Sequence, residues 1–417
     1  MFASIRTHTI EPIRSFNRAA RLFLLMIFID GLILSGWQLF FNFYILQNGH
    51  NADFLGLVNS LPYAASLIFG IPLGRLSDRI GRKASLIIGL AASNLTMVAQ
   101  TTFRQPSLII TFAFLSGVFN MLFIIGQAPL MVKLSNPENR TMLFSLNFGL
   151  QTVSGALGSV FAGQLPGFFG TLLHVDANSA TAYQAVLIVS ILLGTTALIP
   201  LWMMKEPSSP PAATLSGLLD KRPSFGLTAM TLKMIAPQVL VGFGAAILIP
   251  YMNVFFKDRF QISDSLLGIL FSISSLMIGI GTVVGPRLAT RLGSKVRAIV
   301  ATQSSSLVFL LLMGFAPLLW ISSIGYLMRS ALMNMSAPLY SAFCMEHTPE
   351  HQQGYVNSLL NLSWNIGWAV GPFISGLVQQ SYGFAPLFVT TAVLYFGAIV
   401  LQWKFFDRVD HIEPVAA

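Results

Sequence analysis

The sequence GRLSDRIGRK occupies residues 74–83 and separates two long apolar segments. A second stretch, PRLATRLGSK, occupies residues 286–295 in the same setting. At one constant offset the two stretches share both interior arginines, a leucine, a glycine and the final lysine. The chain is therefore an internal duplication. A repeated six-helix half, with a charged loop between its second and third helices, is typical of a secondary transporter built from two bundles.

The composition indicates a membrane protein. The 417 residues are 54% hydrophobic and only 9% charged, with a mean hydropathy of +0.71, whereas soluble domains average about 25% charged residues. An apolar segment of about 20 residues crosses a bilayer as a helix. We predict an all-α membrane protein with twelve such segments, at residues 22–46, 54–74, 84–102, 107–133, 143–165, 182–204, 234–256, 265–286, 297–316, 320–343, 355–378 and 385–405.

Prolines mark the boundary between the two halves. Pro207, Pro210 and Pro211 lie in a stretch rich in serine, alanine and glycine, and proline prevents a helix from continuing through it. The predicted organisation is a tail at 1–21, a six-helix bundle at 22–204, a linker at 205–232, a second six-helix bundle at 233–405 and a tail at 406–417.

The lysines and arginines explain the net charge of +9 without a nucleic-acid partner. Nearly all of them fall in the two tails, the linker and the loops on one side of the predicted membrane. Because such loops stay in the cytoplasm, both termini are predicted to be cytoplasmic, in a multi-pass protein of a bacterial-type inner membrane.

The sequence lacks the residue patterns that are typical of catalytic or cofactor-binding sites. Cys344 is the single cysteine, which excludes an intramolecular disulfide and a multi-cysteine metal site. The chain has no phosphate-binding Gly-x-x-x-x-Gly-Lys-Ser/Thr motif. We therefore expect no enzyme activity, no metal and no cofactor, and a proton gradient as the driving force.

The segment 74–83, with Ala84, Ser85 and Leu86 after it, resembles the signature of the major facilitator superfamily, Gly-x-Leu-(Ala/Ser)-Asp-Arg-x-Gly-Arg-Lys-x-x-Leu. A degenerate copy lies where the eighth and ninth helices are predicted to join. The resemblance covers essentially the whole chain. It implies two pseudo-symmetric six-helix bundles, a central cavity lined mainly by helices 1, 4, 7 and 10, and alternating access to the two sides of the membrane.

The two signature segments are predicted to gate that cavity. Asp78 would accept hydrogen bonds from the amino-terminal end of the eleventh helix, at residues 354–358, and so latch the bundles together. Thr290 replaces the acid in the second copy, so a latch there is weaker or absent. The alternative is that these cations only fix the orientation in the membrane. The predicted gating residues are Gly74, Asp78, Arg79, Gly81, Arg82, Lys83, Arg287, Arg291 and Gly293.

Asp30 and Arg329 are the acid and the base that lie well inside predicted helices, the first and the tenth. A charge at that depth costs several kcal/mol unless it faces a cavity or a partner. Asp30 is predicted to carry a proton or a cationic substrate, and Arg329 to tune it or to bind anionic groups. A fixed salt bridge between the two residues is the structural alternative.

Neutral polar residues in the helices supply the remaining candidates. Asn357, Asn361 and Asn365 recur at every fourth position and form one polar stripe, which serves either as a substrate path or as interhelical contact. The residues predicted to line the cavity are Trp37, Gln38, Asn42, Asn120, Gln127, Gln151, Asn253, Tyr326, Asn334, Tyr340, Asn361, Trp364 and Asn365.

These features predict a monomeric secondary active transporter that moves a small organic solute through the lipid bilayer by alternating access. Its many phenylalanine and methionine side chains favour proton-coupled efflux of amphipathic or drug-like compounds. Two alternatives remain. One is uptake or uniport of a polar metabolite, such as a sugar or an organic acid, with Arg329 as the anchor. The other is a non-transporting receptor or assembly factor that retains the fold.

Overall fold

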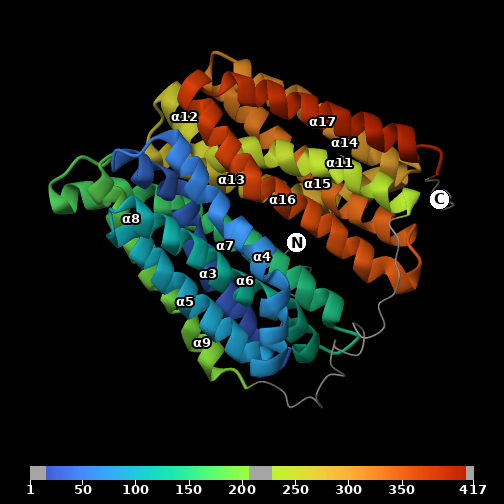
Figure 1. Ribbon diagram of the computed structural model, residues 1–417, viewed down its shortest axis with the longest axis horizontal. Helices are drawn as coiled ribbons and strands as arrows, with labels where there is room; N and C mark the ends of the chain where they lie inside the picture. The colour runs from blue at the N-terminus through green and yellow to red at the C-terminus, as the bar shows by residue number, and fades with distance from the viewer. Residues whose placement is uncertain (1–15, 206–227, 410–417) are drawn as a thin grey trace, which may run out of the picture.

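The computed structural model describes residues 16–205 and 228–409, which are helical and contain no strand (Figure 1). Most of the predicted linker and most of both predicted tails lie outside these residues. The helices of the first half are α3 (Arg18–Gln47), α4 (Ala52–Ile80), α5 (Arg82–Thr102), α6 (Pro106–Leu134), α7 (Arg140–Leu173), α8 (Ala180–Thr195) and α9 (Leu198–Met203).

The second half repeats this order. Its helices are α11 (Ala229–Leu248), the 3-10 turn η2 (Ile249–Tyr251), α12 (Met252–Phe260), α13 (Asp264–Leu292), α14 (Lys295–Phe315), α15 (Leu319–Glu346), α16 (Glu350–Tyr382) and α17 (Ala385–Phe406). Each predicted segment coincides with a helix, and two of them are broken: α8 is followed by α9, and η2 separates α11 from α12. Pro250 lies in η2, where proline cannot supply the amide that a continuous helix needs.

The predicted loop at 74–83 is wrong in its extent. Helix α4 continues to Ile80 and α5 begins at Arg82, so Gly81 alone joins them, with a φ of 91°. In the second copy α13 continues to Leu292, and Gly293 has a φ of 63°. A glycine in this left-handed region of φ turns the chain without steric cost. The charged residues before it can therefore remain helical, extending beyond the apolar part of the span.

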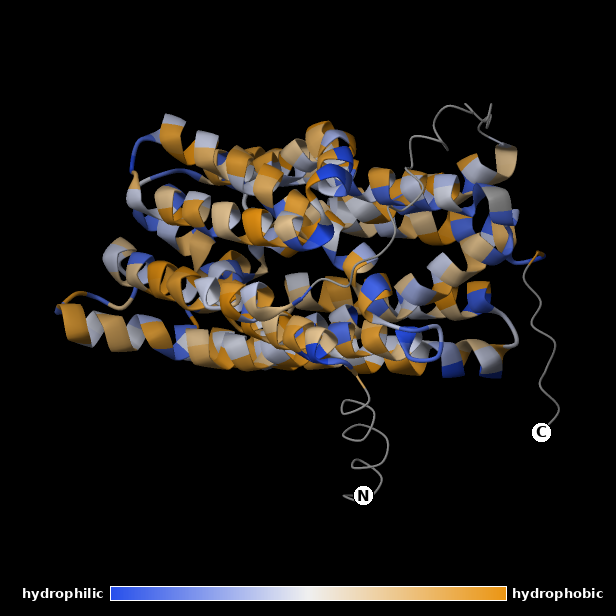
Figure 2. Ribbon diagram, turned by 90° about the horizontal axis from the view of Figure 1, so that it is seen from below, coloured by the Kyte–Doolittle hydropathy of each residue, from blue (hydrophilic) through white to orange (hydrophobic). Residues whose placement is uncertain are grey.

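The chain is a multi-pass membrane protein. Ten helical spans are long and apolar enough to cross a bilayer. Hydrophobic residues run along most of the length of the helices (Figure 2), and large apolar side chains such as Ile71 and Leu95 are exposed. The two long helices that fall short of this criterion are α15 and α16. These are the helices that carry Arg329 and the asparagine stripe, respectively.

The two halves lie side by side (Figure 1) and meet along two seams, α4 against α16 and α7 against α13. We call the end of the molecule that holds Gly81 and Gly293 the basic end, and the end that holds residues 48–51, 174–179 and 261–263 the opposite end. The largest hydrophobic core lies toward the opposite end and draws side chains from both halves, among them Tyr183 and Phe256.

At the basic end each half has a core of its own. One contains Phe123 and Leu130 of the first half, and the other contains Ile299 and Phe343 of the second half. The halves are thus joined at the opposite end and packed separately at the basic end.

Candidate functional site

Glycines bring the two halves into backbone contact on both seams. A Cβ atom added to Gly268 of α13 would lie 2.4 Å from the Ser159 carbonyl oxygen of α7 and 2.9 Å from the Gly163 Cα. A Cβ atom added to Gly376 of α16 would lie 2.3 Å from a carbonyl oxygen of α4. Only glycine permits so close an approach. Because Gly163 and Gly376 occupy equivalent positions of the duplication, the two crossings are related by its pseudo-symmetry.

A buried ion pair closes the opposite end. Lys257 and Asp264 of the second half pair with each other, and their side chains are 18% and 8% exposed. The Lys257 Nζ also donates to the Tyr183 hydroxyl at 2.7 Å and to the Asn178 Oδ1 at 2.6 Å, both in the first half. The Tyr183 hydroxyl in turn lies 3.3 Å from an Asp264 carboxylate oxygen. This cluster, which we call the outer clamp, joins the halves through charge-assisted hydrogen bonds.

Nothing in the sequence singled out the outer clamp. Lys257 and Asp264 fall at the ends of predicted apolar segments, where charged residues are ordinary. Their role depends on Tyr183, which is distant in the sequence and which only the fold brings to them.

Two predicted cavity residues, Asn42 and Asn253, lie in the joined region instead of an open cavity. The Asn42 Nδ2 donates to the Asn253 Oδ1 at 2.9 Å and to the Pro250 carbonyl oxygen at 2.7 Å. The Asn253 Nδ2 donates to the Leu39 carbonyl oxygen at 2.8 Å. Both asparagines are almost fully buried. In this conformation they connect the halves, because an amide can donate and accept across a helix contact and thereby satisfy buried polar groups.

Tyr326 and Tyr340 are likewise packed inside the second half and do not line a cavity in this conformation. The Tyr340 hydroxyl donates to the Met234 carbonyl oxygen at 2.6 Å, and the Tyr326 ring lies against Phe256 and Phe271. The other predicted lining residues are exposed or half-buried and therefore accessible: Trp37, Gln38, Asn120, Gln127, Gln151, Asn334, Asn361, Trp364 and Asn365.

The ion pairs that the described signature residues form at the basic end stay within one half. Asp78 pairs with Arg82, which also donates to the Ser77 Oγ at 2.9 Å. In the second half Lys295 pairs with Glu346.

The predicted latch between Asp78 and the start of α16 is not made in this conformation. Arg79, Arg287 and Arg291 are exposed, and a Cβ atom added to Gly354 of α16 would meet no atom within 4 Å. The basic end is therefore open between the signature of the first half and α16.

Asp30 and Arg329 do not form the alternative salt bridge. The Arg329 Nη2 donates to the Tyr395 hydroxyl of α17 at 2.9 Å, and the side chain is 3% exposed. Asp30 is half-buried on α3, and its carboxylate has neither a hydrogen bond nor an ion pair among the described residues. The structure thus leaves one membrane-embedded carboxylate without a partner.

A comparison with known protein families identifies the family of this chain. The model of the Major Facilitator Superfamily matches the chain twice, over residues 23–235 and 234–416. The chain belongs to the Major Facilitator Superfamily. It is a membrane transporter and not an enzyme, and the two matches follow the duplication visible in the sequence.

Curated relatives are multidrug resistance proteins. MdtG of Dickeya zeae (strain Ech586) is 23% identical over 402 residues, which cover 93% of this chain and 94% of that protein. MdtG of Yersinia enterocolitica is 26% identical over 183 residues, and this match spans only 42% of each chain.

Among solved structures, the inward-facing, occupied form of a bacterial homologue of the human lysosomal transporter Spinster has a TM-score of 0.76 at 14% identity. The match covers 92% of this chain and 95% of that one. A bacterial homologue of the iron transporter ferroportin, also inward-facing, has a TM-score of 0.72 at 15% identity, covering 93% and 98%. These likenesses establish the fold.

Weakening the outer clamp is expected to open the opposite end. Asp264→Asn removes the charge that holds Lys257, and a hydrogen bond to a charged group contributes about 1.5–3 kcal/mol. Spin labels are attached to cysteines at Leu172 and Tyr382, which are exposed at the opposite end in different halves. The distribution of distances between the two labels should shift toward longer distances in the variant. The native cysteine is first replaced, by Cys344→Ser, so that only the two introduced cysteines carry labels. Asp258→Asn alters an exposed acid of α12 and is the matched control; equal distance distributions in the two variants would contradict a clamp.

Proposed function

We propose that the protein is a proton-coupled efflux transporter of amphipathic, drug-like organic compounds. Asp30 carries the proton or the charge of a cationic substrate, and Arg329 tunes Asp30 or binds anionic groups. The chain resides in a bacterial inner membrane with both termini in the cytoplasm. The names of the MdtG relatives support the substrate class.

The observation that carries the proposal is the unpartnered carboxylate of Asp30. An ionised acid in the hydrocarbon layer costs several kcal/mol, so it requires a proton, a cation or a water-filled cavity beside it. No described side chain supplies a cation or a hydrogen bond to the Asp30 carboxylate. A group that can be neutral in one state of the transporter and charged in another is what proton coupling requires.

The conformation supports the same cycle. Lysines and arginines concentrate at the basic end, which the positive-inside rule assigns to the cytoplasm. The halves are separated there and joined at the opposite end, so this is the inward-facing state, ready to receive a compound from the cytoplasm or the inner leaflet. In the outward-facing state the outer clamp opens, and the latch between Asp78 and α16 forms.

Reconstitution tests the proposal directly. The purified protein is placed in liposomes that enclose a pH-sensitive dye, and a panel of lipophilic cations, lipophilic anions, sugars and hydrophilic organic acids is added. We expect proton movement with amphipathic compounds and not with the sugars. Proton movement evoked only by sugars or hydrophilic acids would favour uptake of a polar metabolite. If no compound moves protons but labelled compounds cross the membrane, the protein is a uniporter.

A further inference from the structure

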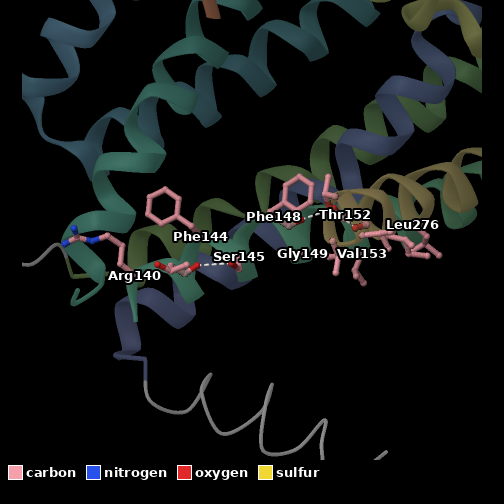
Figure 3. A pocket seen from close by; sticks show the side chains of 14 residues that line it. Arg140, Phe144, Ser145, Phe148, Gly149, Thr152, Val153 and Leu276 are labelled. Atoms are coloured by element: carbon pink, nitrogen blue, oxygen red, sulfur yellow. Dashed lines mark hydrogen bonds between the residues drawn. The ribbon is translucent and has the colours of Figure 1, made fainter. Parts of the chain in front are cut away.

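A crevice lies between the halves on the seam of α7 and α13, toward the basic end (Figure 3). Its volume is about 980 Å³, at the upper end of the range for sites that hold drug-sized ligands. Residues 140–153 of α7 and 276–284 of α13 provide its entire lining. The two helices touch at Gly163 and Gly268 and are separated by this crevice nearer the basic end. The lining comes from these two helices alone, and its α13 side includes the exposed apolar residues Ile280 and Val283, as expected for a seam open to the membrane.

The lining of the crevice is suited to hydrocarbon. Phe144 and Phe148 of α7 and Val283 of α13 are exposed in it. The hydroxyls of Ser145 and Thr152 donate to carbonyl oxygens of their own helix, each at 2.9 Å, and Thr282 does the same at 2.8 Å. Since these donors are already satisfied, they offer little to a polar ligand. Apolar surface with few competing donors favours a hydrocarbon or aromatic body.

One cation, Arg140, lies at the end of this lining. It is the only charged residue among those that form the crevice. In Figure 3 it lies at the far end from Leu276, and its guanidinium extends beyond Phe144. The Arg140 Nε is buried and has no hydrogen-bond partner in the described part of the chain. A buried donor without an acceptor is destabilising, and a guanidinium is suited to bind a carboxylate or a phosphate.

The second seam shows that this lining is not imposed by the fold. The offset that relates Gly163 to Gly376 also relates Phe144 and Phe148 of α7 to Asn357 and Asn361 of α16. The same offset pairs Arg140 with Gln353 and Thr152 with Asn365. One seam therefore carries a cation and aromatic rings where its duplicate carries amides. A difference of this kind, at matched positions of one fold, indicates a specialised surface on the α7 side.

We propose that this crevice binds an amphipathic organic anion, with its hydrocarbon or aromatic body against Phe144 and Phe148 and its carboxylate or phosphate at Arg140. The proposal rests on the transport function proposed above and deepens it. The crevice is the lateral entry site from the leaflet at the basic end. The substrate class carries a negative charge, so Asp30 carries the proton and not the charge of a cationic substrate.

Photo-crosslinking tests the site without requiring transport. The full chain is placed in phosphatidylcholine nanodiscs with dodecyl phosphate that carries a diazirine on its alkyl chain, and labelled peptides are mapped by mass spectrometry. We expect labelling at 140–153 and 276–284 to exceed labelling of the α4 and α16 seam. Unlabelled dodecyl phosphate should compete, and dodecyltrimethylammonium should not. Arg140→Gln should lower labelling about tenfold, as for the loss of one charge-assisted hydrogen bond.

Two further variants sharpen the result. Phe148→Asn installs the amide of the second seam and should reduce labelling. Arg408→Gln removes an exposed arginine at the same end, outside the crevice, and should leave labelling unchanged. Equal labelling of both seams, or equal labelling by a diazirine phosphatidylcholine, would show ordinary lipid contact and overturn the proposal, as would full labelling in Arg140→Gln.

The outcomes separate the two proposals. Specific labelling without any proton movement would leave the binding site standing and remove the proposed coupling. Proton movement without specific labelling would remove the binding site alone.

Discussion

Asp30→Asn is expected to abolish the proton movement that substrate evokes in liposomes, leaving the rate of liposomes without protein. Asparagine has nearly the size of aspartate and keeps a polar group on α3, but it cannot release or accept a proton at neutral pH. Because Asp30 has no partner among the described residues, the substitution breaks no visible contact. Folding and membrane insertion should therefore be retained. The measurement is dye fluorescence inside the liposomes after substrate is added.

A second assay separates the two roles proposed for Asp30. Exchange of labelled for unlabelled substrate across the membrane needs no net proton transfer. If Asp30 carries only the proton, this exchange continues in Asp30→Asn while proton movement stops. If it holds a cationic substrate, both stop. Undiminished proton movement in the variant would show that Asp30 is not the coupling group, and Asp258→Asn, at an exposed acid, serves as the control.

Gly268→Leu is expected to stop transport by preventing closure of the opposite end. Its Cβ atom would lie 2.4 Å from the Ser159 carbonyl oxygen, closer than real Cβ contacts, and the obstacle is backbone. Neither helix can yield locally, so α7 and α13 must separate. We expect substrate flux to fall to background, and spin labels at Leu172 and Tyr382 to report the longer separation in nearly all molecules.

The matched control for Gly268→Leu is Gly167→Leu. Gly167 lies on α7, and a Cβ atom there would meet no atom within 4 Å. The Gly167→Leu variant should transport normally. That result would show that a larger side chain on α7 does not by itself impair membrane insertion. Normal flux in Gly268→Leu would mean that the crossing of Gly163 and Gly268 need not form during transport.

The helices and their duplication could be predicted from the sequence because both depend on local patterns. Apolar segments of sufficient length identify the spans, and the repeat of residues 74–83 at 286–295 aligns the two halves. The end of α4 could not be predicted in the same way. Charged residues near a membrane surface are stable in a helix or a loop, and only the conformation of Gly81 decides where the turn lies.

The candidate site was predictable only where a residue conflicted with its surroundings. Asp30 and Arg329 stand out because they are charges in apolar segments, and their functional roles stay predictions. Asn42 and Tyr340 do not conflict with a helix, so the sequence leaves open whether they face a cavity or a neighbour. The rotation and packing of the helices decide this: Asn42 contacts α12 and η2, and Tyr340 contacts α11.

The crevice depends on features that no single stretch reveals. Phe144 and Phe148 are unremarkable in a membrane helix, and Arg140 lies at a helix end where cations are common. Their significance arises from the angle between α7 and α13. It becomes visible in the sequence only when the α7 residues are set against their duplicates on α16.

The single apolar core at the opposite end also gives the transport cycle a thermal signature. Opening that end separates the two parts of the core that contains Tyr183 and Phe256. Apolar side chains of both halves then become exposed to water. The basic end has no shared core to divide, because each half keeps its own. Exposing apolar surface raises the heat capacity, and its free-energy cost falls on cooling. We therefore expect cooling to favour the state in which the opposite end is open, as long as closing the basic end buries less apolar surface than opening the opposite end exposes.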